Sequence, residues 1–174
     1  YTVLTETGAK GTVSVAAASK SISGELNIHE SVENGNVAYS VKVIVDFAFR
    51  DCIGFTQMEI PNSVMTIGQY AFCGCSGFTG KLMIPSNVTS IGKCSFERCS
   101  GFTGIELPSS ITNIEEGFFE DCSSLKGILT IPNSITSIGK FAFSGCQKLS
   151  GTLTIPGSVT TIGRDAFHAC GFTS

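Results

Sequence analysis

Proline, phenylalanine and cysteine recur along this chain at intervals of 23 or 24 residues. From residue 52 onward, this period repeats one short unit five times. The residues that keep the period are Pro61, Pro85, Pro108, Pro132 and Pro156; Phe49, Phe72, Phe96, Phe119, Phe143 and Phe167; and Cys52, Cys75, Cys99, Cys122, Cys146 and Cys170. A constant period of this length predicts a solenoid of about six turns, in which each unit packs only on its neighbours.

Composition excludes two classes of partner. Charged residues make up 14% of the chain and its net charge is −3, so neither nucleic acid nor an anionic membrane is an expected ligand. Mean hydropathy is positive, +0.28, but no apolar run approaches the ~18 residues of a membrane-spanning helix. We therefore expect no insertion into a membrane and attribute the hydropathy to short buried segments.

Each repeat contains one segment with the alternation of a strand. In the fourth copy Leu129 and Ile131 flank Thr130, which predicts a short strand with two side chains inward. Pro132 ends this strand because proline has no N–H for a ladder hydrogen bond. Gly139 is expected to make a corner at positive φ, although Val45 and Glu115 stand at equivalent positions. The matching inward pairs are Met58/Ile60, Leu82/Ile84, Ile105/Leu107 and Leu153/Ile155.

The repeat resembles the BspA-like leucine-rich repeat family. The resemblance rests on the segments 60–75, 131–146 and 155–170, which share the order Ile-Pro, Ile-Gly, Ala-Phe and a closing cysteine. It covers roughly residues 26–174. The third copy departs from the pattern, because Gly117 is displaced and Phe118 replaces a small residue, so we expect a local adjustment there. The resemblance implies a right-handed, β-rich coil with short strands on one face and few or no long helices.

The same resemblance divides the chain into three parts. Residues 1–25 are expected to form an N-terminal cap. Residues 26–54 read as a stretched first repeat with a hairpin insert, because Asn34-Gly35 is a strong two-residue turn signal. This opening copy resembles those of surface proteins from Bacteroidetes. Residues 55–174 then hold five BspA-like repeats.

Cysteine chemistry is expected to be structural. The six periodic cysteines point the same way about 4.8 Å apart, which favours a ladder of buried free thiols over disulfides. Cys73 and Cys94 lie outside this ladder, and we expect them to be accessible; the sequence does not say whether they are free or modified. A zinc site at Cys73-x-Cys75 with Cys94 is disfavoured because Cys75 belongs to the repeat. A Cys–His nucleophile using His168 has no third orienting partner in the sequence. We therefore expect no cofactor, no metal and no enzymatic activity.

The candidate binding residues are the outward side chains two and four positions before each proline, here called the pre-proline row. In a curved solenoid such a row lines one face, and we expect that face to be concave and to bind partners. The alternative is that the row is a solvated sheet face; exposed Met83 and Ile128 favour a contact surface. A second outward row of Thr and Ser, including Thr112, Thr136 and Thr160, is expected to stabilise the stack through hydroxyl pairs. The candidate contact residues are Gln57, Glu59, Lys81, Met83, Glu106, Ile128, Thr130, Thr152 and Thr154.

Function follows from the resemblance rather than from the period. The chain begins without an apolar signal segment, which fits a cytosolic protein or a trimmed mature fragment. The resemblance implies a cell-surface or secreted, non-enzymatic module that binds a protein or glycan ligand at a host or microbial surface. The alternative is a passive spacer segment of a longer surface repeat protein. An uncapped final turn would also permit end-to-end self-association.

Overall fold

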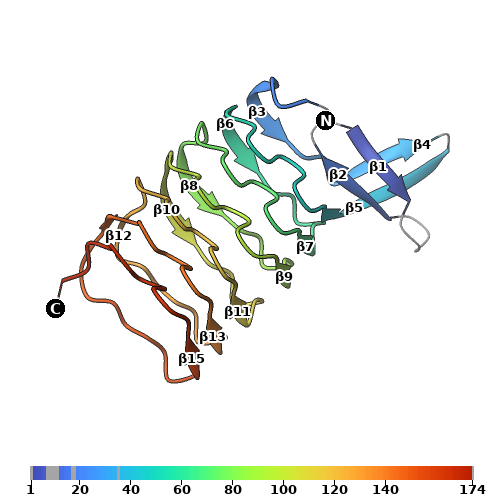
Figure 1. Cartoon of the computed structure of the whole chain (residues 1–174). Coiled ribbons are helices and arrows are strands. Elements are labelled where there is room, and N and C mark those ends of the chain that lie inside the picture. Colours follow the sequence, from blue (N-terminus) through green and yellow to red (C-terminus); the bar gives the residue numbers. More distant parts are fainter. Residues whose placement is uncertain (1, 7–11, 17–18, 35, 174) are drawn as a thin grey trace.

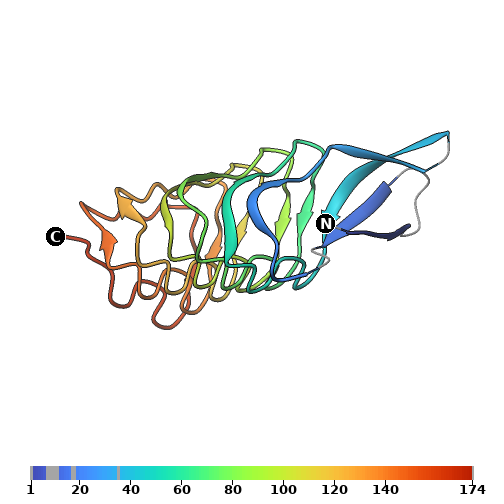
Figure 2. The same ribbon diagram turned by 90° about the horizontal axis from the view of Figure 1, so that it is seen from above.

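The computed structural model describes residues 2–6, 12–16, 19–34 and 36–173. Within these residues the chain is a β-solenoid that contains no helix, which confirms the predicted fold class. It has about five turns where about six were expected, and its strands form two rows where strands on one face were expected. Figure 1 shows the turns stacked side by side, from the strands near the N-terminus to the last turn before the C-terminus. Figure 2 shows the same rod from above, with β4 and β5 extending beyond the stack at one end.

One row of strands precedes the prolines. The sequence predicted these strands correctly at the segments ending in Pro61, Pro85 and Pro108. The predicted strands directly before Pro132 and Pro156 are absent, because residues 128–131 and 150–155 are not in strands and the short strands of those turns end earlier. Gly127 and Gly151 have φ of 82° and 76°, but Gly80 of β8 has a φ of 78° as well, so left-handed glycine does not explain the missing strands. The parallel pairs are β3 (Ser23–Asn27) with β6 (Gly54–Glu59), β8 (Gly80–Met83) with β10 (Phe102–Glu106), and β12 (Lys126–Gly127) with β14 (Lys148–Leu149).

A second row of strands coincides with the predicted Thr/Ser row. Hydroxyl groups do stabilise this row, but they donate mainly to backbone carbonyls of the preceding turn. Thr136 Oγ1 lies 3.2 Å from the Thr112 carbonyl, and Thr160 Oγ1 lies 3.1 Å from the Thr136 carbonyl. The row contains β5 (Val37–Ile44), β7 (Thr66–Ile67) and β9 (Ser90–Ile91) in one sheet, and β11 (Asn113–Ile114), β13 (Ser137–Ile138) and β15 (Thr161–Ile162) in another.

The N-terminal strands extend the second row. β1 (Thr2–Glu6) pairs antiparallel with β2 (Thr12–Ala16), and β2 pairs parallel with β5. Val15 of β2 is fully buried against the first turn. β4 (Ser31–Asn34) forms an antiparallel hairpin with β5 at the place of the Asn-Gly signal. Hydrogen bonding of β5 to β7 joins this opening region to the regular turns.

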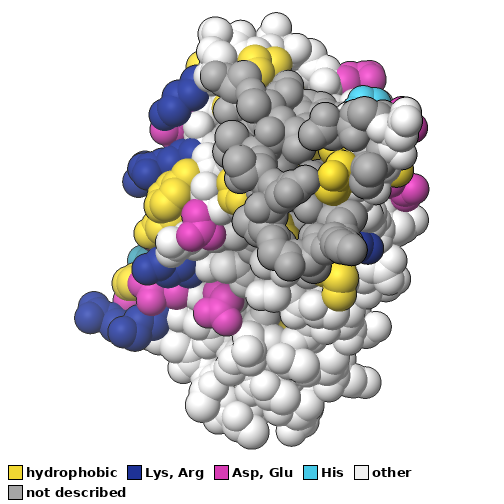
Figure 3. All heavy atoms as spheres, turned by 90° about the vertical axis from the view of Figure 1, so that its right-hand side faces the viewer, with side chains coloured by type: hydrophobic (Ala, Val, Ile, Leu, Met, Phe, Trp, Pro, Cys, Tyr) yellow, Lys and Arg dark blue, Asp and Glu magenta, His cyan; other side chains and the backbone are white. Residues whose placement is uncertain are grey.

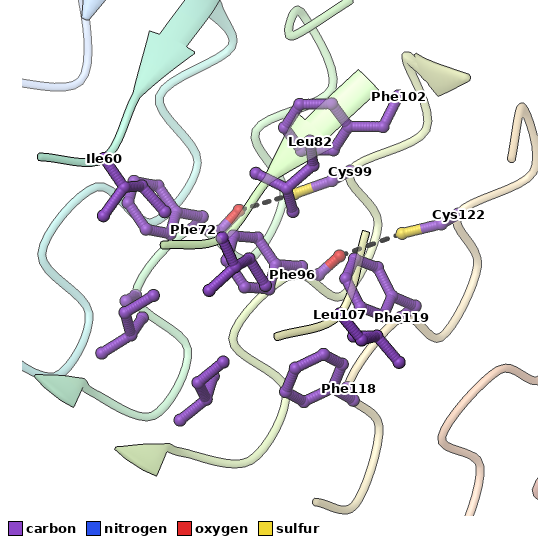
Figure 4. Packing of buried hydrophobic residues seen from close by; sticks show 14 of the residues in the cluster. Ile60, Phe72, Leu82, Phe96, Cys99, Phe102, Leu107, Phe118, Phe119 and Cys122 are labelled. Atoms are coloured by element: carbon purple, nitrogen blue, oxygen red, sulfur yellow. Dashed lines mark hydrogen bonds between the residues drawn. The ribbon is translucent and has the colours of Figure 1, made fainter. Parts of the chain in front are cut away.

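Two ladders of phenylalanine fill the core. Phe72, Phe96 and Phe119 stack face to face with ring centroids 5.3 Å apart at each step (Figure 4). A second ladder of Phe55, Phe78 and Phe102 lies beside the first and meets it edge to face. Each turn therefore covers the rings of its neighbours, which one turn alone cannot bury.

The role predicted for Gly139 was wrong. Gly139 and its equivalents Gly68, Gly92 and Gly163 do not have positive φ. A Cβ at Gly92 would lie 2.5 Å from the Gln69 nitrogen in the preceding turn, so glycine here permits close stacking of two turns. The positive-φ position lies two residues later and is occupied by Tyr70, Cys94, Gly117, Phe141 and Asp165.

The departure at the third copy leaves the coil intact. Gly117 has a φ of 62° and occupies the same left-handed position as Cys94 in the turn before. Phe118 is fully buried and meets the ring of Phe119 edge to face, with centroids 4.7 Å apart. The larger side chain is thus accommodated in the core without breaking the stack.

Candidate functional site

The pre-proline row lies on the outer face of the first row of strands. Strand alternation places Leu82 inward, whereas Lys81 and Met83 point to solvent. Ile128 is 74% exposed and Met83 is 55% exposed, so two large apolar side chains stand in water on this face. Every candidate contact residue is exposed: Gln57, Glu59, Lys81, Met83, Glu106, Ile128, Thr130, Thr152 and Thr154.

A groove runs over this face. Its first part has a volume of about 960 Å³, and its second part of about 520 Å³ continues toward the C-terminal turns. The two parts share Lys81, Glu106, Leu107, Thr130 and Pro132, so they form one continuous hollow. Neither part is lined by Thr152 or Thr154. The structure therefore brings seven of the nine candidate residues together and leaves those two outside.

Sequence reasoning missed the residues that form one wall of the groove. Asn62, Ser86 and Ser109 each follow a proline and line the first part. The signal that could have found them is the polar residue that follows four of the five periodic prolines. The groove is thus bounded by the outward strand side chains and by these amide and hydroxyl groups.

Charge is unevenly distributed in the groove. Lys81 Nζ lies 2.6 Å from Glu106 Oε2, and both side chains are more than half exposed. Among the residues that the structure describes, no ion pair or side-chain hydrogen bond reaches Glu25 or Glu59. The end of the groove near the N-terminal turns therefore presents free carboxylates, and the other end presents Ile128, the Thr130 hydroxyl group and the Lys126 ammonium group.

The periodic cysteines form the predicted ladder of free thiols. From Cys75 onward, each Sγ donates a hydrogen bond to a phenylalanine carbonyl of the preceding turn; Cys99 Sγ lies 3.0 Å from the Phe72 oxygen and Cys122 Sγ 3.0 Å from the Phe96 oxygen (Figure 4). Burial raises the pKa of the Cys99 and Cys122 thiols well above the ordinary value. These thiols therefore tie successive turns together and are not reactive groups.

The expectation that Cys73 and Cys94 are accessible was wrong. Both are free but buried, at 5% and 7% exposure, so they are not the accessible thiols that their position suggested. Burial raises the pKa of each to about 11. Within the described residues, no group of three or more His, Cys, Asp or Glu side chains is placed to hold a metal ion.

Thiol reactivity tests this description. In the native chain at mildly alkaline pH, we expect only Cys170 to react readily with a thiol reagent, because it is half-buried and the others are buried. Burial raises the pKa of the Cys170 thiol to about 11 as well, so its greater exposure, and not its acidity, should distinguish it from the buried sulfurs. All eight should react after unfolding in guanidinium chloride. Fast reaction of three thiols in the native chain would instead show that Cys73 and Cys94 are accessible.

The sequence pattern of the BspA type leucine rich repeat region matches residues 42–174 in six copies. The chain belongs to this family. Sequence comparison with curated proteins gives no match. Proteins built from this BspA-type repeat and their structural neighbours are typically binding or structural proteins rather than enzymes.

Solved structures place this BspA-type chain among bacterial repeat proteins. A leucine rich cell surface protein from Faecalibacterium prausnitzii is 25% identical with a TM-score of 0.67; the match covers 100% of this chain and 54% of that one. The Treponema pallidum leucine rich repeat protein is 27% identical with a TM-score of 0.50, covering 93% and 61%. The pneumococcal vaccine antigen PcpA, at 18% identity and a TM-score of 0.52 over 98% and 45%, shares the fold.

The BspA-type chain thus spans little more than half of the first of these proteins. In the part of the chain that the structure describes, no helix is long and apolar enough to cross a membrane. The groove over the pre-proline row is the main hollow on the face that carries the candidate contact residues.

Proposed function

We propose that this chain is a non-enzymatic recognition module at a cell surface, which binds a protein or glycan ligand through the groove over the pre-proline row. The observation that carries the proposal is the continuous groove itself, which holds free carboxylates and exposed Met83 within one surface. Large apolar side chains that remain exposed beside polar groups are typical of contact surfaces. The surface location is supported by the Faecalibacterium prausnitzii relative, which is described as a cell surface protein.

The groove has the chemistry of a protein-binding or glycan-binding surface. Amide and hydroxyl groups of Asn62, Ser86 and Ser109 supply hydrogen-bond donors and acceptors along one wall. Glu59 and Glu106 supply negative charge at the floor, which would favour ligands with complementary basic groups. Binding without turnover is proposed because proteins of this repeat type are typically binding or structural proteins.

Reversing two charges in the groove tests the proposal. The variant Glu59→Lys with Glu106→Lys should weaken binding of a ligand found by screening host matrix proteins and surface glycans, by about tenfold or more if both carboxylates are contacted. Its melting temperature should stay nearly unchanged, because the Lys81–Glu106 pair is exposed and such pairs contribute little to stability.

Glu116→Lys is the matched control, because Glu116 is exposed and does not line the groove. A saturable ligand lost only with the groove variant supports recognition at this face. A ligand that binds both variants equally would place the binding site elsewhere. The absence of any ligand in the screen would favour a passive spacer instead.

A further inference from the structure

The solenoid has another distinctive surface, here called the turn edge. It consists of the tight turns between the second row of strands and the closing cysteines: residues 46–51, 69–74, 93–98, 116–121, 140–145 and 164–169. Successive turns are joined there by backbone hydrogen bonds, such as Phe47 N–H to the Gln69 carbonyl at 2.9 Å. Figure 3 shows Lys and Arg side chains gathered along one edge of the molecule, beside acidic and hydrophobic ones. The groove does not include any of these residues.

An aromatic pair stands on the turn edge of the first two turns. The rings of Phe47 and Tyr70 are stacked, with centroids 5.3 Å apart and planes within 4° of each other. Phe47 is 46% exposed, unlike Phe49, which is fully buried in the core ladder. The neighbouring Cys94 side chain raises the pKa of the Tyr70 hydroxyl group. The pair is therefore a fixed aromatic surface in contact with water.

The stack of turns does not require this pair. At the equivalent position the later turns carry Cys94, Gly117, Phe141 and Asp165, yet the coil continues unchanged, and no ring contact of Phe141 with a neighbouring turn is found among the described residues. The inner phenylalanine ladder, in contrast, runs through all the turns. Phe47 and Tyr70 thus form a local addition to the repeat, which favours a role in contact over a role in folding.

Arg50 lies over both rings. Its Cζ atom is 5.7 Å from the Phe47 centroid and 5.6 Å from the Tyr70 centroid, within the range of cation–π attraction. Its neighbour Asp51 is held at 2.8 Å by Lys20 Nζ, whereas Arg50 Nε is 3.8 Å from the same carboxylate. Among the described residues, no side-chain hydrogen bond uses the terminal nitrogens of Arg50. The guanidinium group is thus oriented by the rings while its donors remain free.

We propose that Arg50, supported by Phe47 and Tyr70, is a second recognition site that binds an acidic side chain of a protein partner. A guanidinium group that is already positioned on aromatic rings offers a planar pair of donors that matches the two oxygens of a carboxylate. The exposed ring surface of Phe47 provides apolar contact around that bond. Tyr and Arg are also the residue types that dominate binding energy in protein interfaces.

The surrounding charges favour a protein over a polysulfated glycan. Asp51 lies between Lys20 and Arg50, and Asp46 on the same edge accepts hydrogen bonds from Gln69, so two carboxylates accompany the two cations. A densely charged polyanion would meet these two carboxylates as well as the two cations. A single carboxylate carried on an otherwise neutral, partly apolar segment meets only the guanidinium group and the rings.

The test measures binding of two labelled, capped hexapeptides by fluorescence anisotropy. One alternates leucine and glutamate, and the other alternates leucine and glutamine. The wild-type chain should bind the glutamate peptide saturably and prefer it over the glutamine peptide. Arg50→Gln should weaken binding of the glutamate peptide by about tenfold or more, and Arg50→Lys by about threefold because lysine lacks the planar pair of donors.

Arg98→Gln is the matched control. Arg98 is exposed on the same edge beside Glu97 and Asp121, but no aromatic ring lies under it among the described residues. Binding that survives Arg98→Gln and the groove variant, but not Arg50→Gln, would support the site. Equal binding of both peptides, or an equal loss with Arg98→Gln, would overturn it. If a heparin hexasaccharide bound more tightly than the glutamate peptide, and this binding depended on Arg50, the assignment to a protein partner would be overturned. If the groove variant lost binding of the glutamate peptide, the peptide would be assigned to the groove and not to Arg50.

Discussion

Replacing Phe96 with alanine is expected to lower the free energy of unfolding by about 3–5 kcal/mol, the usual cost of removing a fully buried phenylalanine. Phe96 is completely buried and stacks on Phe72 and Phe119, with both centroid distances 5.3 Å. It also meets Phe118 edge to face. The substitution therefore opens a cavity in the middle of the stack, where both neighbouring turns lose contact. Denaturation with urea, followed by circular dichroism, measures the change.

Phe47→Ala is the control for this variant. Phe47 is also a phenylalanine of the repeat region, but its side chain is 46% exposed. Its replacement should therefore lower the free energy of unfolding much less than that of Phe96. If Phe96→Ala lowered the free energy of unfolding by less than about 1 kcal/mol, the description of a continuous ladder would be contradicted. Removing a buried ring from a close-packed core destabilises a protein by more than that. A separate early transition in the unfolding curve would show that the two halves of the stack unfold independently, which is a known behaviour of repeat arrays.

Gly92→Ala is expected to destabilise the chain by about 1–3 kcal/mol, the range typical of an overpacked contact. The added Cβ would lie 2.5 Å from the Gln69 nitrogen and 2.8 Å from the Gln69 Cα atom. Both are backbone atoms of the preceding turn, so no side chain can rotate away to make room. The two turns would have to separate locally, which would also strain the backbone hydrogen bond from Gly92 to the Ile67 carbonyl.

Gly157→Ala provides a matched control. Gly157 also follows the repeat pattern, but nothing lies within 4 Å of a Cβ built there and its φ is not in the left-handed region. Alanine at this position should be neutral or slightly stabilising, by up to about 1 kcal/mol, because it restricts the unfolded chain. If Gly92→Ala were as harmless as Gly157→Ala, close approach of the turns would not be the reason for glycine at Gly92. The same urea titrations distinguish the two cases.

The candidate site was predictable to the extent that it follows the period. Counting back from each proline found the exposed side chains of Lys81, Met83 and Glu106, because strand alternation assigns each position to one face. The continuous hollow was not readable in this way. It is lined by the residues that follow Pro61, Pro85 and Pro108 as well as by the strand side chains, and it ends before Thr152 and Thr154.

Features that depend on the approach of two turns were predicted less well. The role of Gly139, the burial of Cys73 and Cys94, and the stacking of Phe47 on Tyr70 all depend on atoms 23 or 24 residues away in the chain. A local pattern shows that positions are equivalent in successive turns. It does not show the distance between those turns or which side chain covers which.

The period of proline, phenylalanine and cysteine was sufficient to identify a solenoid of BspA-type repeats, because it shows which side chains must share one core. It also determined the ladder of free thiols, since equivalent positions in stacked turns point the same way. Three features became visible only in the folded chain: the glycine positions that permit close contact, the position of the groove, and the placement of Arg50 over two rings. The physical reason is that these properties arise from packing between turns, which depends on the shapes of both partners and not on either segment alone.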